Sequence, residues 1–539
     1  MLFASIGQTT KRTHLIAGAL IALHAIFSLH AMTRLSPAWD EIAYPYSGYV
    51  QLTTGSLEHY PHNPFLARLL SGLPFLFTEV ETKPTDDPAA DGFAFTYKEK
   101  RSPQTTVFLG RLSAFVFSLL LAFLIYWTAR RQWSDAGGLL ALVAYLTTPI
   151  FLSRASLGLV EMPMYVFIML SLWWFEEKPA AAGAAMGLAL LCKFAALPAL
   201  AALLVVYFLS KRPKAALFFA AAALGLVLAA YLPWKGGLAA LQAALADVFA
   251  FNKKIPYYFF GAARDNAPGV ISLLALALKS PPLPVIFGLW GLWAGWSSTE
   301  GKRALKPFLF MAAAYLLYGT FTGAPVSTVQ LSPVYLALAF AAGALASKLA
   351  AAAKRVKIAA GVFIALAVAN VYAAHPNYLG YFNPAAGGTN FGHIWLGDSD
   401  QDWGQSLPSL ARLLKRAPHA TVFLAYSGAG KPEAYGINYV DFFSPSLASK
   451  DHEDAPLPMP MQLTQTVLVV GTKVPQAYRE AFAWLANART PRKIVDGNFL
   501  IYDVTVDPEA IEWMGRFYLE TGRAEKAMWC LFRGKALRK

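Results

Sequence analysis

Long apolar segments recur through most of this chain and leave few folds open to it. They occupy residues 14–31, 106–128, 136–153, 162–175, 182–192, 195–209, 215–232, 282–297, 307–322, 333–347 and 358–374. Hydrophobic residues make up 56% of the chain and charged residues 14%, whereas a soluble protein carries about 25% charged residues. A helix that crosses a membrane needs roughly twenty apolar residues. The sequence therefore predicts a polytopic, all-α membrane protein with about eleven transmembrane helices.

Basic clusters between these segments predict how the chain is oriented. Five clusters fall on one side if the spans alternate, and they begin at Lys11, Arg130, Lys211, Lys302 and Lys354. Positive residues concentrate in cytoplasmic loops, so we assign that side, with the N-terminus, to the cytoplasm. The loop after the first segment, residues 233–281 and the tail from residue 375 then lie on the exterior face. The same clusters explain the net charge of +14, and no basic stripe with interleaved aromatics favours nucleic acid.

The pattern of apolar and charged residues predicts three domains. Residues 1–374 form the expected transmembrane domain, with a first exterior loop at 33–105. In residues 375–505 the β-like runs TVFLAY, QTVLVVGT and NFLIYDVT alternate with helical or turn-rich stretches, which predicts a small exterior α/β domain. Residues 506–539 hold two helical patterns around a Thr-Gly-Arg turn. They resemble a tetratricopeptide hairpin, which needs a neighbour to cover its faces.

Two of the exterior loops carry finer predictions. In the first, a short helix is expected at 64–77, with Asn63 as its cap and Pro64 in its first turn. The stretch TKPTDDPAADG in the same loop indicates a flexible, turn-rich segment. In the second loop, residues 268–278 predict a helix lying in the membrane interface, with Lys279 extending its charge to the surface.

Acidic residues near the exterior face are the first candidates for a catalytic site. Asp40 and Glu41 directly follow the first apolar segment, where two carboxylates are costly unless they have a function. They can serve as a base with a metal ligand, or as a base with an orienting partner. The alternative is that one caps a helix and the other is solvated. Glu161 opens a later segment on the same face, where a second acid favours a functional role over a charge at a helix N-terminus. His62 precedes the first-loop helix, and a local role beside the cap explains it equally well.

Basic residues near the same face are candidates for binding a phosphate. They are Arg154, Lys193, Lys253, Lys254, Arg264 and Lys279. Interfacial anchoring explains many such residues, but a phosphate carried on a lipid would also need Lys charges and Arg forks. Lys193 is the hardest to explain as an anchor, because it lies between two apolar segments. No Gly-rich phosphate loop, zinc-ligand spacing or serine elbow appears, which disfavours a nucleotide-driven pump and an intramembrane protease.

Several motifs, taken in order, resemble a known family. They are WDEIAYPYSGYVQLTTGSLEHYPHNPFLARLLSGLP, SLGLVEMP, GLALLCKFAALPAL, ALALKSPPLP, and HPNYLGYFNPAAGG followed by GDSDQDWGQSLPSLARLL. They resemble the bacterial, aminoarabinose transferase-like relatives of the dolichyl-phosphate-mannose protein mannosyltransferases, in the GT-C superfamily of glycosyltransferases. Together the motifs cover most of the chain.

The resemblance implies a glycosyltransferase that uses a polyprenyl-phosphate sugar as its donor. Such an enzyme transfers the sugar to an acceptor hydroxyl at the exterior face of the bacterial cytoplasmic (inner) membrane, with inversion at the anomeric carbon. Asp40 matches the general base, Glu41 its neighbour, and Glu161 the acid of the second loop. Lys193 and Lys279 match the basic positions near the donor phosphate.

Other residues complete the predicted site, and some motifs depart from the family pattern. Arg264 and Arg154 join the phosphate-binding set, while His62 and Glu161 are candidates for acceptor or metal binding, with Mg²⁺ or Mn²⁺ left open as a cofactor. Asn63 replaces a usual Pro, and Glu161 replaces a usual Asp. The loop GAPVSTVQLSP lacks a His-Arg-Tyr pattern, which argues against a donor contact from that loop.

Two other classes of function fit the composition. A transporter or flippase of lipid-linked substrates should show repeated halves with matching broken helices, and no such repeat appears in the sequence. A non-catalytic relative that acts as a scaffold through its outer domain is opposed by the presence of Asp40, Glu41 and the basic set. Neither the sugar nor the acceptor, whether protein, lipid or glycan, follows from the sequence.

Overall fold

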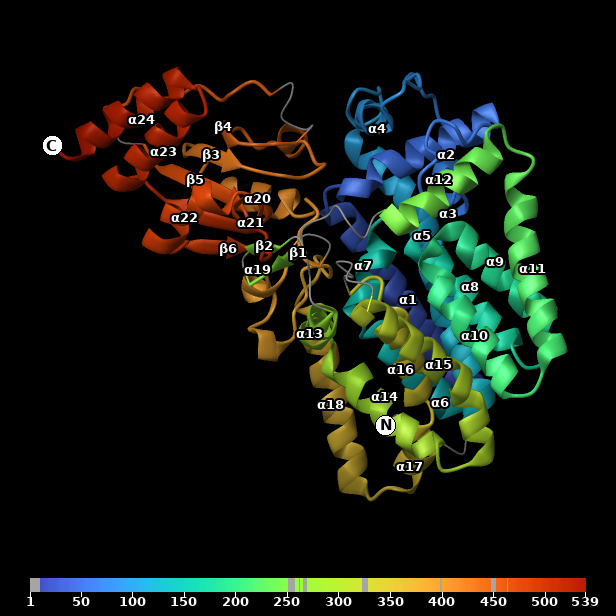
Figure 1. Cartoon of the computed structure of the whole chain (residues 1–539). Helices are drawn as coiled ribbons and strands as arrows, with labels where there is room; N and C mark the ends of the chain where they lie inside the picture. Colours follow the sequence, from blue (N-terminus) through green and yellow to red (C-terminus); the bar gives the residue numbers. More distant parts are fainter. Residues whose placement is uncertain are drawn as a thin grey trace. The chain divides into compact units, whose positions relative to one another are not determined.

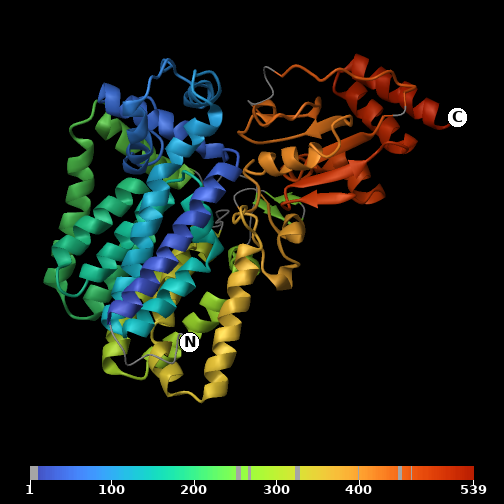
Figure 2. The same cartoon turned by 180° about the vertical axis from the view of Figure 1, so that it is seen from behind.

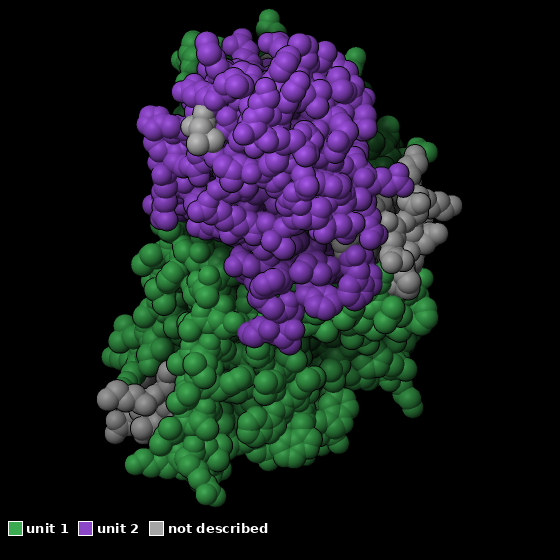
Figure 3. Space-filling view, turned by 90° about the vertical axis from the view of Figure 1, so that its left-hand side faces the viewer, with its two compact units in different colours: residues 1–33, 40–256, 265–383 green, residues 34–39, 257–264, 384–539 purple. Residues whose placement is uncertain are grey.

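The chain folds into two compact units, coloured separately in Figure 3. The computed structural model describes residues 10–250, 257–260, 262–264, 269–321, 328–397, 400–446, 452–462 and 464–539. Unit 1 comprises residues 1–33, 40–256 and 265–383, and unit 2 comprises residues 34–39, 257–264 and 384–539. Two short internal segments therefore belong to the same unit as the C-terminal part of the chain.

Unit 1 is built from helices (Figures 1 and 2). They are α1 (Thr10–Arg34), α2 (Ala43–Thr54), α3 (Leu66–Gly72), α4 (Pro88–Tyr97), α5 (Pro103–Gln132), α6 (Asp135–Leu146), α7 (Pro149–Ser156), α8 (Glu161–Trp174), α9 (Pro179–Cys192), α10 (Leu197–Leu209), α11 (Pro213–Tyr231), α12 (Gly237–Ala250), α13 (Val270–Lys279), α14 (Pro282–Gly295), α15 (Thr299–Phe321), α16 (Pro333–Ala342), α17 (Leu345–Ala351) and α18 (Lys354–Tyr372). Helix α5 packs against α6 and α8, α9 against α8 and α11, and α14 against α16.

The helices confirm a multi-pass membrane protein, but the predicted number of spans is not confirmed. Six helices in the described part of the chain are long and apolar enough to cross a membrane, or up to eight if each of two bent pairs is one span. Every predicted segment contains a helix. Several are too short for the roughly twenty residues that a perpendicular span needs, among them α8 and α9 with 14 residues each. Apolar composition therefore locates the helices without fixing how many of them cross.

Both bent pairs break next to a proline. Helices α6 and α7 meet at 67°, and Pro149 begins α7; α13 and α14 meet at 109°, with Pro281 and Pro282 at the corner. Proline cannot donate the helical hydrogen bond, so it is favoured in the first turn of a helix, where that N–H would have no helical partner. In both pairs it therefore stands at the start of the second helix. The helix predicted at 268–278 is confirmed as α13. The predicted surface position of Lys279 is wrong, because this side chain is buried and donates to the Leu379 carbonyl oxygen at 2.7 Å.

Helices α2 and α3 of the first loop pack backbone to backbone. A Cβ atom on Gly48 would lie 2.0 Å from the Arg68 carbonyl oxygen, and one on Gly72 would lie 2.4 Å from the Gly48 carbonyl carbon. Helix α3 and a following 3₁₀ turn, Leu73–Phe77, confirm the expected helical segment. Asn63 is not its cap, because its φ of 60° is left-handed and the helix begins three residues later.

The polar stretch of the first loop, residues 82–92, was expected to be flexible and turn-rich; residues 82–87 are irregular, but the stretch continues into a capped helix. Asp87 caps α4 by accepting hydrogen bonds from two backbone N–H groups of its first turn, and Pro88 stands at the first helical position. Asp91 is buried, pairs with His59 at 2.9 Å, and accepts from the backbone and side chain of Thr85. The stretch therefore continues into a capped helix, because Asp87 bonds the first helical N–H groups and Asp91 bonds His59 and Thr85.

Unit 2 contains a mixed sheet with helices on both faces. Its elements are β1 (Tyr257–Phe259), β2 (Ala262–Arg264), α19 (Gly392–Trp395), α20 (Leu407–Leu414), β3 (Thr421–Ala425), β4 (Val440–Phe443), β5 (Thr466–Gly471), α21 (Lys473–Ala477), α22 (Arg479–Ala488), β6 (Lys493–Val495), β7 (Phe499–Asp503), α23 (Pro508–Glu520) and α24 (Ala524–Leu537). Strands β1 and β2 form an antiparallel pair. The larger sheet has the order β4-β3-β5-β7-β6, with β3 parallel to β4 and β5, and β7 antiparallel to β5 and β6.

The three β-like runs of the sequence form the three central strands of this sheet. Their side chains alternate between two cores, as the period of a strand requires. Val422 and Leu424 pack with α20, whereas Phe423 packs with α22, α23 and α24. The edge strands β4 and β6 were not predicted, because four and three residues are too few to show a pattern.

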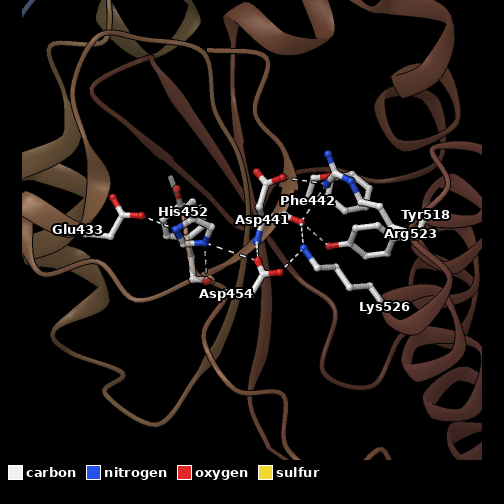
Figure 4. Close-up of polar contacts among 9 residues, drawn as sticks. Glu433, Asp441, Phe442, His452, Asp454, Tyr518, Arg523 and Lys526 are labelled. Atoms are coloured by element: carbon white, nitrogen blue, oxygen red, sulfur yellow. Dashed lines mark hydrogen bonds and ion pairs between the residues drawn. The ribbon is translucent and has the colours of Figure 1, made fainter. Parts of the chain in front are cut away.

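The C-terminal helices α23 and α24 pack together and are tied to the edge strand β4 (Figure 4). Arg523 Nη1 donates to Asp441 Oδ2 at 2.8 Å, and the Tyr518 hydroxyl donates to the Asp441 carbonyl oxygen at 2.9 Å. Lys526 forms an ion pair with Asp454, which also accepts the Asp441 backbone N–H. The hairpin of α23 and α24 therefore covers one edge of the sheet. Its apolar face is buried against the sheet, and its polar residues bond to Asp441 and Asp454. These contacts show a helical hairpin, without confirming a tetratricopeptide unit.

Candidate active site

Asp40 lies in a short 3₁₀ turn, Trp39–Glu41, between α1 and α2. The turn follows Pro37 and Ala38, and α2 begins two residues after it. Asp40 is half-buried, and its Oδ2 atom accepts a hydrogen bond from the Tyr44 hydroxyl at 3.2 Å. Tyr44 stands four residues on, in the first turn of α2, so one helical turn brings the phenol over the carboxylate. The sequence folds locally to hold Asp40 while leaving part of it accessible.

Glu161 and Lys193 form an ion pair close to Asp40. Lys193 Nζ donates to Glu161 Oε1 at 2.6 Å; the glutamate is buried and the lysine is partly exposed. Glu161 begins α8, and Lys193 interrupts the path from α9 to α10 with an extended backbone. Arg154 in the last turn of α7 is fully buried, and its charge acts on both Glu161 and Asp40. Four sequence-predicted residues from separate elements therefore meet in one electrostatic cluster.

The surroundings of Asp40 favour its protonated form. Burial raises the pKa of the Asp40 carboxyl above its usual range, which is the largest effect. The positive charge of Lys193 opposes this increase, and the negative charge of Glu161 adds to it. A carboxylate with a raised pKa is a stronger proton acceptor near neutral pH. The arrangement thus gives Asp40 the property that a general base needs.

Glu41 points to other partners. Arg111 of α5 binds it in a bidentate manner, with Nε donating to Oε1 at 2.7 Å and Nη2 donating to Oε2 at 2.8 Å. The Gly158 backbone N–H also donates to Oε1, and Arg111 Nη1 donates to the Met32 carbonyl oxygen. Both charged side chains are buried. Glu41 therefore ties the turn that carries Asp40 to α5 and to the loop before α8.

His62 also has a partner outside the cluster. Its Nδ1 atom lies 2.7 Å from Asp247 Oδ2 in α12; the His62 side chain is exposed and the Asp247 side chain is partly exposed. The segment around it is held by Arg68, which is fully buried and donates to the carbonyl oxygens of Tyr60 and His62 at 2.8 and 2.9 Å. The contact between His62 and Asp247 therefore joins the first loop to α12.

The remaining predicted phosphate ligands divide into two groups. Lys279 is buried, bonds the Leu379 carbonyl oxygen, and places Nζ 4.5 Å from the centre of the Phe382 ring. It also lines a small cavity with Pro281 and Tyr335. Only the backbone of Arg264, in β2, is described. Lys253 and Lys254 lie outside the described residues, as does the first part of the GAPVSTVQLSP loop, residues 323–327.

Two residues of the site were not singled out from the sequence, although each carried a signal. Arg111 is a charged residue inside an apolar segment, which by itself indicates a buried partner. Tyr44 stands four residues after Asp40, the spacing that places two side chains on the same face of a helix. A third candidate feature, a metal centre, has no support: in the ranges that the structure describes, no group of three His, Cys, Asp or Glu residues is placed to hold an ion.

Comparison with known proteins relates this geometry to a family and a fold. A sequence model of the dolichyl-phosphate-mannose-protein mannosyltransferase family matches residues 104–235. No curated protein sequence matches the chain. The structure is similar to ArnT from Cupriavidus metallidurans in the apo state, with a TM-score of 0.51, 14% identity, and coverage of 91% of this chain and 98% of that one. ArnT from the same organism bound to undecaprenyl phosphate gives a TM-score of 0.49, 15% identity, and coverage of 90% and 97%.

The family match includes two of the motifs on which the resemblance rests, SLGLVEMP and GLALLCKFAALPAL. The family match spans α5 to α11, the helices that supply Arg111, Arg154, Glu161 and Lys193. At these identities the structural likeness concerns the fold alone. The expected resemblance is confirmed: the chain has the fold of ArnT and, over residues 104–235, the sequence character of the dolichyl-phosphate-mannose-protein mannosyltransferases.

Proposed function

We propose that this protein is a glycosyltransferase that moves a sugar from a polyprenyl-phosphate donor to an acceptor hydroxyl at the exterior face of the membrane. One observation carries the proposal: a half-buried carboxylate, Asp40, lies beside the Glu161–Lys193 ion pair and the Arg154 charge. Transfer from a lipid phosphate needs a base for the acceptor and positive charge for the leaving group. Both are present in one cluster, within the fold of ArnT.

In the proposed reaction Asp40 accepts the proton of the acceptor hydroxyl. The hydroxyl oxygen attacks the anomeric carbon as the bond from that carbon to the phosphate oxygen breaks. The bonding electrons leave with the polyprenyl phosphate, and direct displacement inverts the anomeric centre. Lys193 has three N–H donors and uses one for Glu161, so two remain for the phosphate. Arg154 adds a fixed positive charge behind the ion pair.

Glu161 and Glu41 take different parts in this proposal. Glu161 Oε2 is buried and accepts no hydrogen bond from the described residues, so in this proposal it accepts a hydrogen bond from the acceptor and orients it. Glu41 is a positioning residue, because Arg111 occupies both of its oxygens. ArnT has been solved with undecaprenyl phosphate, and we carry the same class of lipid to this chain as the donor carrier.

The test is transfer in vitro by the purified protein with a labelled polyprenyl-phosphate sugar. Replacing Asp40 by Asn keeps the shape and removes the base, and we expect turnover to fall by about 10²–10⁴-fold. Asp135→Asn is the matched control, since Asp135 pairs with Arg130 at the other end of α5 and should leave turnover unchanged. Near-normal turnover of Asp40→Asn excludes Asp40 as the base. If the unsubstituted protein neither transfers the sugar nor hydrolyses any of the tested donors, the result argues against the proposed transferase activity itself.

A further inference from the structure

A second cavity of unit 1 lies at the opposite end of α8 from Glu161. It has a volume of about 660 Å³ and is bounded by the ends of α8, α10 and α14 and by the beginning of α15. Glu161 begins α8, and Glu176 lies two residues beyond its last residue, Trp174. The 14 residues of α8 rise about 21 Å, so this cavity is separate from the cluster around Asp40.

The polar lining of the cavity is strongly basic. It contains Arg212, Lys302, Arg303 and Lys306 against one carboxylate, Glu176. Arg212 and Arg303 share that carboxylate, donating to the same Oε2 atom at 3.0 and 2.7 Å. Lys306 Nζ donates to the Ser210 hydroxyl at 3.3 Å. Among the described residues no carboxylate pairs with either lysine, so the cavity keeps a net charge of about +3.

The position of these cations on α15 is unfavourable without an anion. Lys302, Arg303 and Lys306 lie in the first two turns of a helix that begins at Thr299. A helix N-terminus carries a partial positive charge, which repels basic side chains and attracts anions. Glu300 in the first turn offsets part of this charge but does not line the cavity. Ser298 already bonds the backbone N–H groups of Gly301 and Lys302, so a bound anion would serve mainly to offset the charges of the basic side chains.

The rest of the lining is apolar and belongs at a membrane surface. Trp296, Phe310 and Val206 form the other wall. Trp296 is 48% exposed at the end of α14, and Trp293 one turn earlier is 66% exposed. Exposed tryptophans at the ends of apolar helices mark the level of the lipid headgroups. The cavity therefore offers cations at the depth of the phosphates and apolar surface at the depth of the acyl chains.

We propose that this cavity binds the phosphate group of an anionic glycerophospholipid, with an acyl chain against Trp296 and Phe310. Basic pockets between membrane helices are known to hold such headgroups. The site would fix the ends of α8, α10, α14 and α15 to one another through the lipid. It goes beyond the proposed glycosyl transfer and does not depend on it, because the ligand is a structural lipid at the other end of α8.

The experiment measures lipid binding by the full chain purified in detergent, with native mass spectrometry. Dioleoyl phosphatidylglycerol is the anionic probe, dioleoyl phosphatidylcholine the zwitterionic one, and inorganic phosphate the headgroup alone. The variant Lys302→Gln/Lys306→Gln removes two charges from the cavity. The matched control, Lys354→Gln/Lys357→Gln, removes two lysines of similar exposure from a cluster expected on the same face.

We expect phosphatidylglycerol, but not phosphatidylcholine, to bind and to raise the melting temperature. The cavity variant should bind it about thirtyfold more weakly, from roughly a fivefold contribution per basic residue, whereas the control keeps its affinity. Equal losses in both variants would reduce the effect to general surface charge and overturn the site. The same stabilisation by inorganic phosphate alone would overturn the lipid as the ligand. Transfer activity, measured in parallel, reports the fold and leaves the two proposals separately testable.

Discussion

Lys193 Nζ lies 2.6 Å from Glu161 Oε1, and the charges of both residues act on the carboxyl group of Asp40. The ion pair thus joins α8 to the break between α9 and α10 and sets the electrostatic surroundings of the candidate base. Because one partner raises the pKa of Asp40 and the other lowers it, the pair can be dissected by substitution.

Removing the negative partner should make the enzyme active at lower pH. In Glu161→Gln, Asp40 loses a charge that raises its pKa, and Lys193 loses the carboxylate that offsets it. The base is active when deprotonated, so activity falls as pH falls through its pKa. A lower pKa therefore moves this acid limb of kcat/KM to lower pH. If the acid limb of kcat/KM stays at the same pH while activity falls, the group that titrates in this limb is not Asp40.

Removing the positive partner should have the opposite effect. In Lys193→Met, Asp40 loses the largest charge that lowers its pKa, so the acid limb should move to higher pH. We also expect KM for the donor to rise, because a phosphate ligand is lost. The matched controls are Glu58→Gln and Lys235→Met. They break an exposed ion pair between the first loop and the turn before α12, and they should leave the pH profile unchanged. Shifts in the same direction for both site variants would contradict the arrangement.

The Glu41–Arg111 pair should matter for stability more than for chemistry. Glu41→Ala leaves a buried guanidinium without its carboxylate, which typically costs about 3–5 kcal/mol. The exposed bidentate pair Glu512–Arg538 is the control, and Glu512→Ala should cost under about 1 kcal/mol. Thermal unfolding in detergent measures both. The double variant Glu41→Gln/Arg111→Met should regain stability and activity together; stable but inactive protein would instead make Glu41 catalytic.

The contact between α2 and α3 should not tolerate a methyl group. Gly48→Ala and Gly72→Ala each place Cβ against the backbone of the facing helix, and overpacking of this kind costs about 1–3 kcal/mol. Gly361→Ala in α18 has open space around its Cβ and serves as the control. The melting temperature reports the difference. If the three substitutions change the melting temperature equally, the close contact between α2 and α3 does not contribute to stability.

The cap of α23 should give unit 2 a pH-dependent local stability. Asp507 accepts the Ala510 backbone N–H, and hydrogen bonds from Arg489 hold its pKa below the usual range. A depressed pKa adds stability above the unfolded value of about 4, and this stability is lost as pH falls through the folded value. Asp507→Asn keeps the cap without this charge. Hydrogen exchange of the first turn of α23 should be faster in the variant at neutral pH, with the gap closing in acid.

The sequence predicts local features such as helices and charged residues beside apolar segments, but it does not predict contacts between residues that are distant in the chain. Asp40, Glu161 and Lys193 were found because charged residues beside apolar segments are rare enough to stand out. Arg154 came from the same loop as Glu161. Their meeting depends on how helices 30 to 150 residues apart pack, and periodicity does not contain that information. The resemblance supplied the expectation of a shared site, and the fold brings the four together.

The errors have equally specific causes. The partner of Glu41 is hidden from the sequence, because Arg111 is 70 residues away in the chain; the predicted catalytic role of Glu41 stays a prediction. The stretch before α4 was read as flexible because the partner of Asp91, His59, precedes it by 32 residues. Strand β4 is short and alternates between buried and half-buried residues, so only its pairing with β3 and its contacts with the terminal helices identify it.

The bidentate anchor of Glu41 has a consequence for protein engineering. Asp40 owes its position to a neighbour that is held by Arg111 in α5 and by the backbone of Gly158. A graft of the acidic dipeptide, or of the whole first loop, would leave those two contacts behind. The smallest portable piece of this site is therefore discontinuous, and a chimera should exchange the first loop together with α5 and the turn before α8.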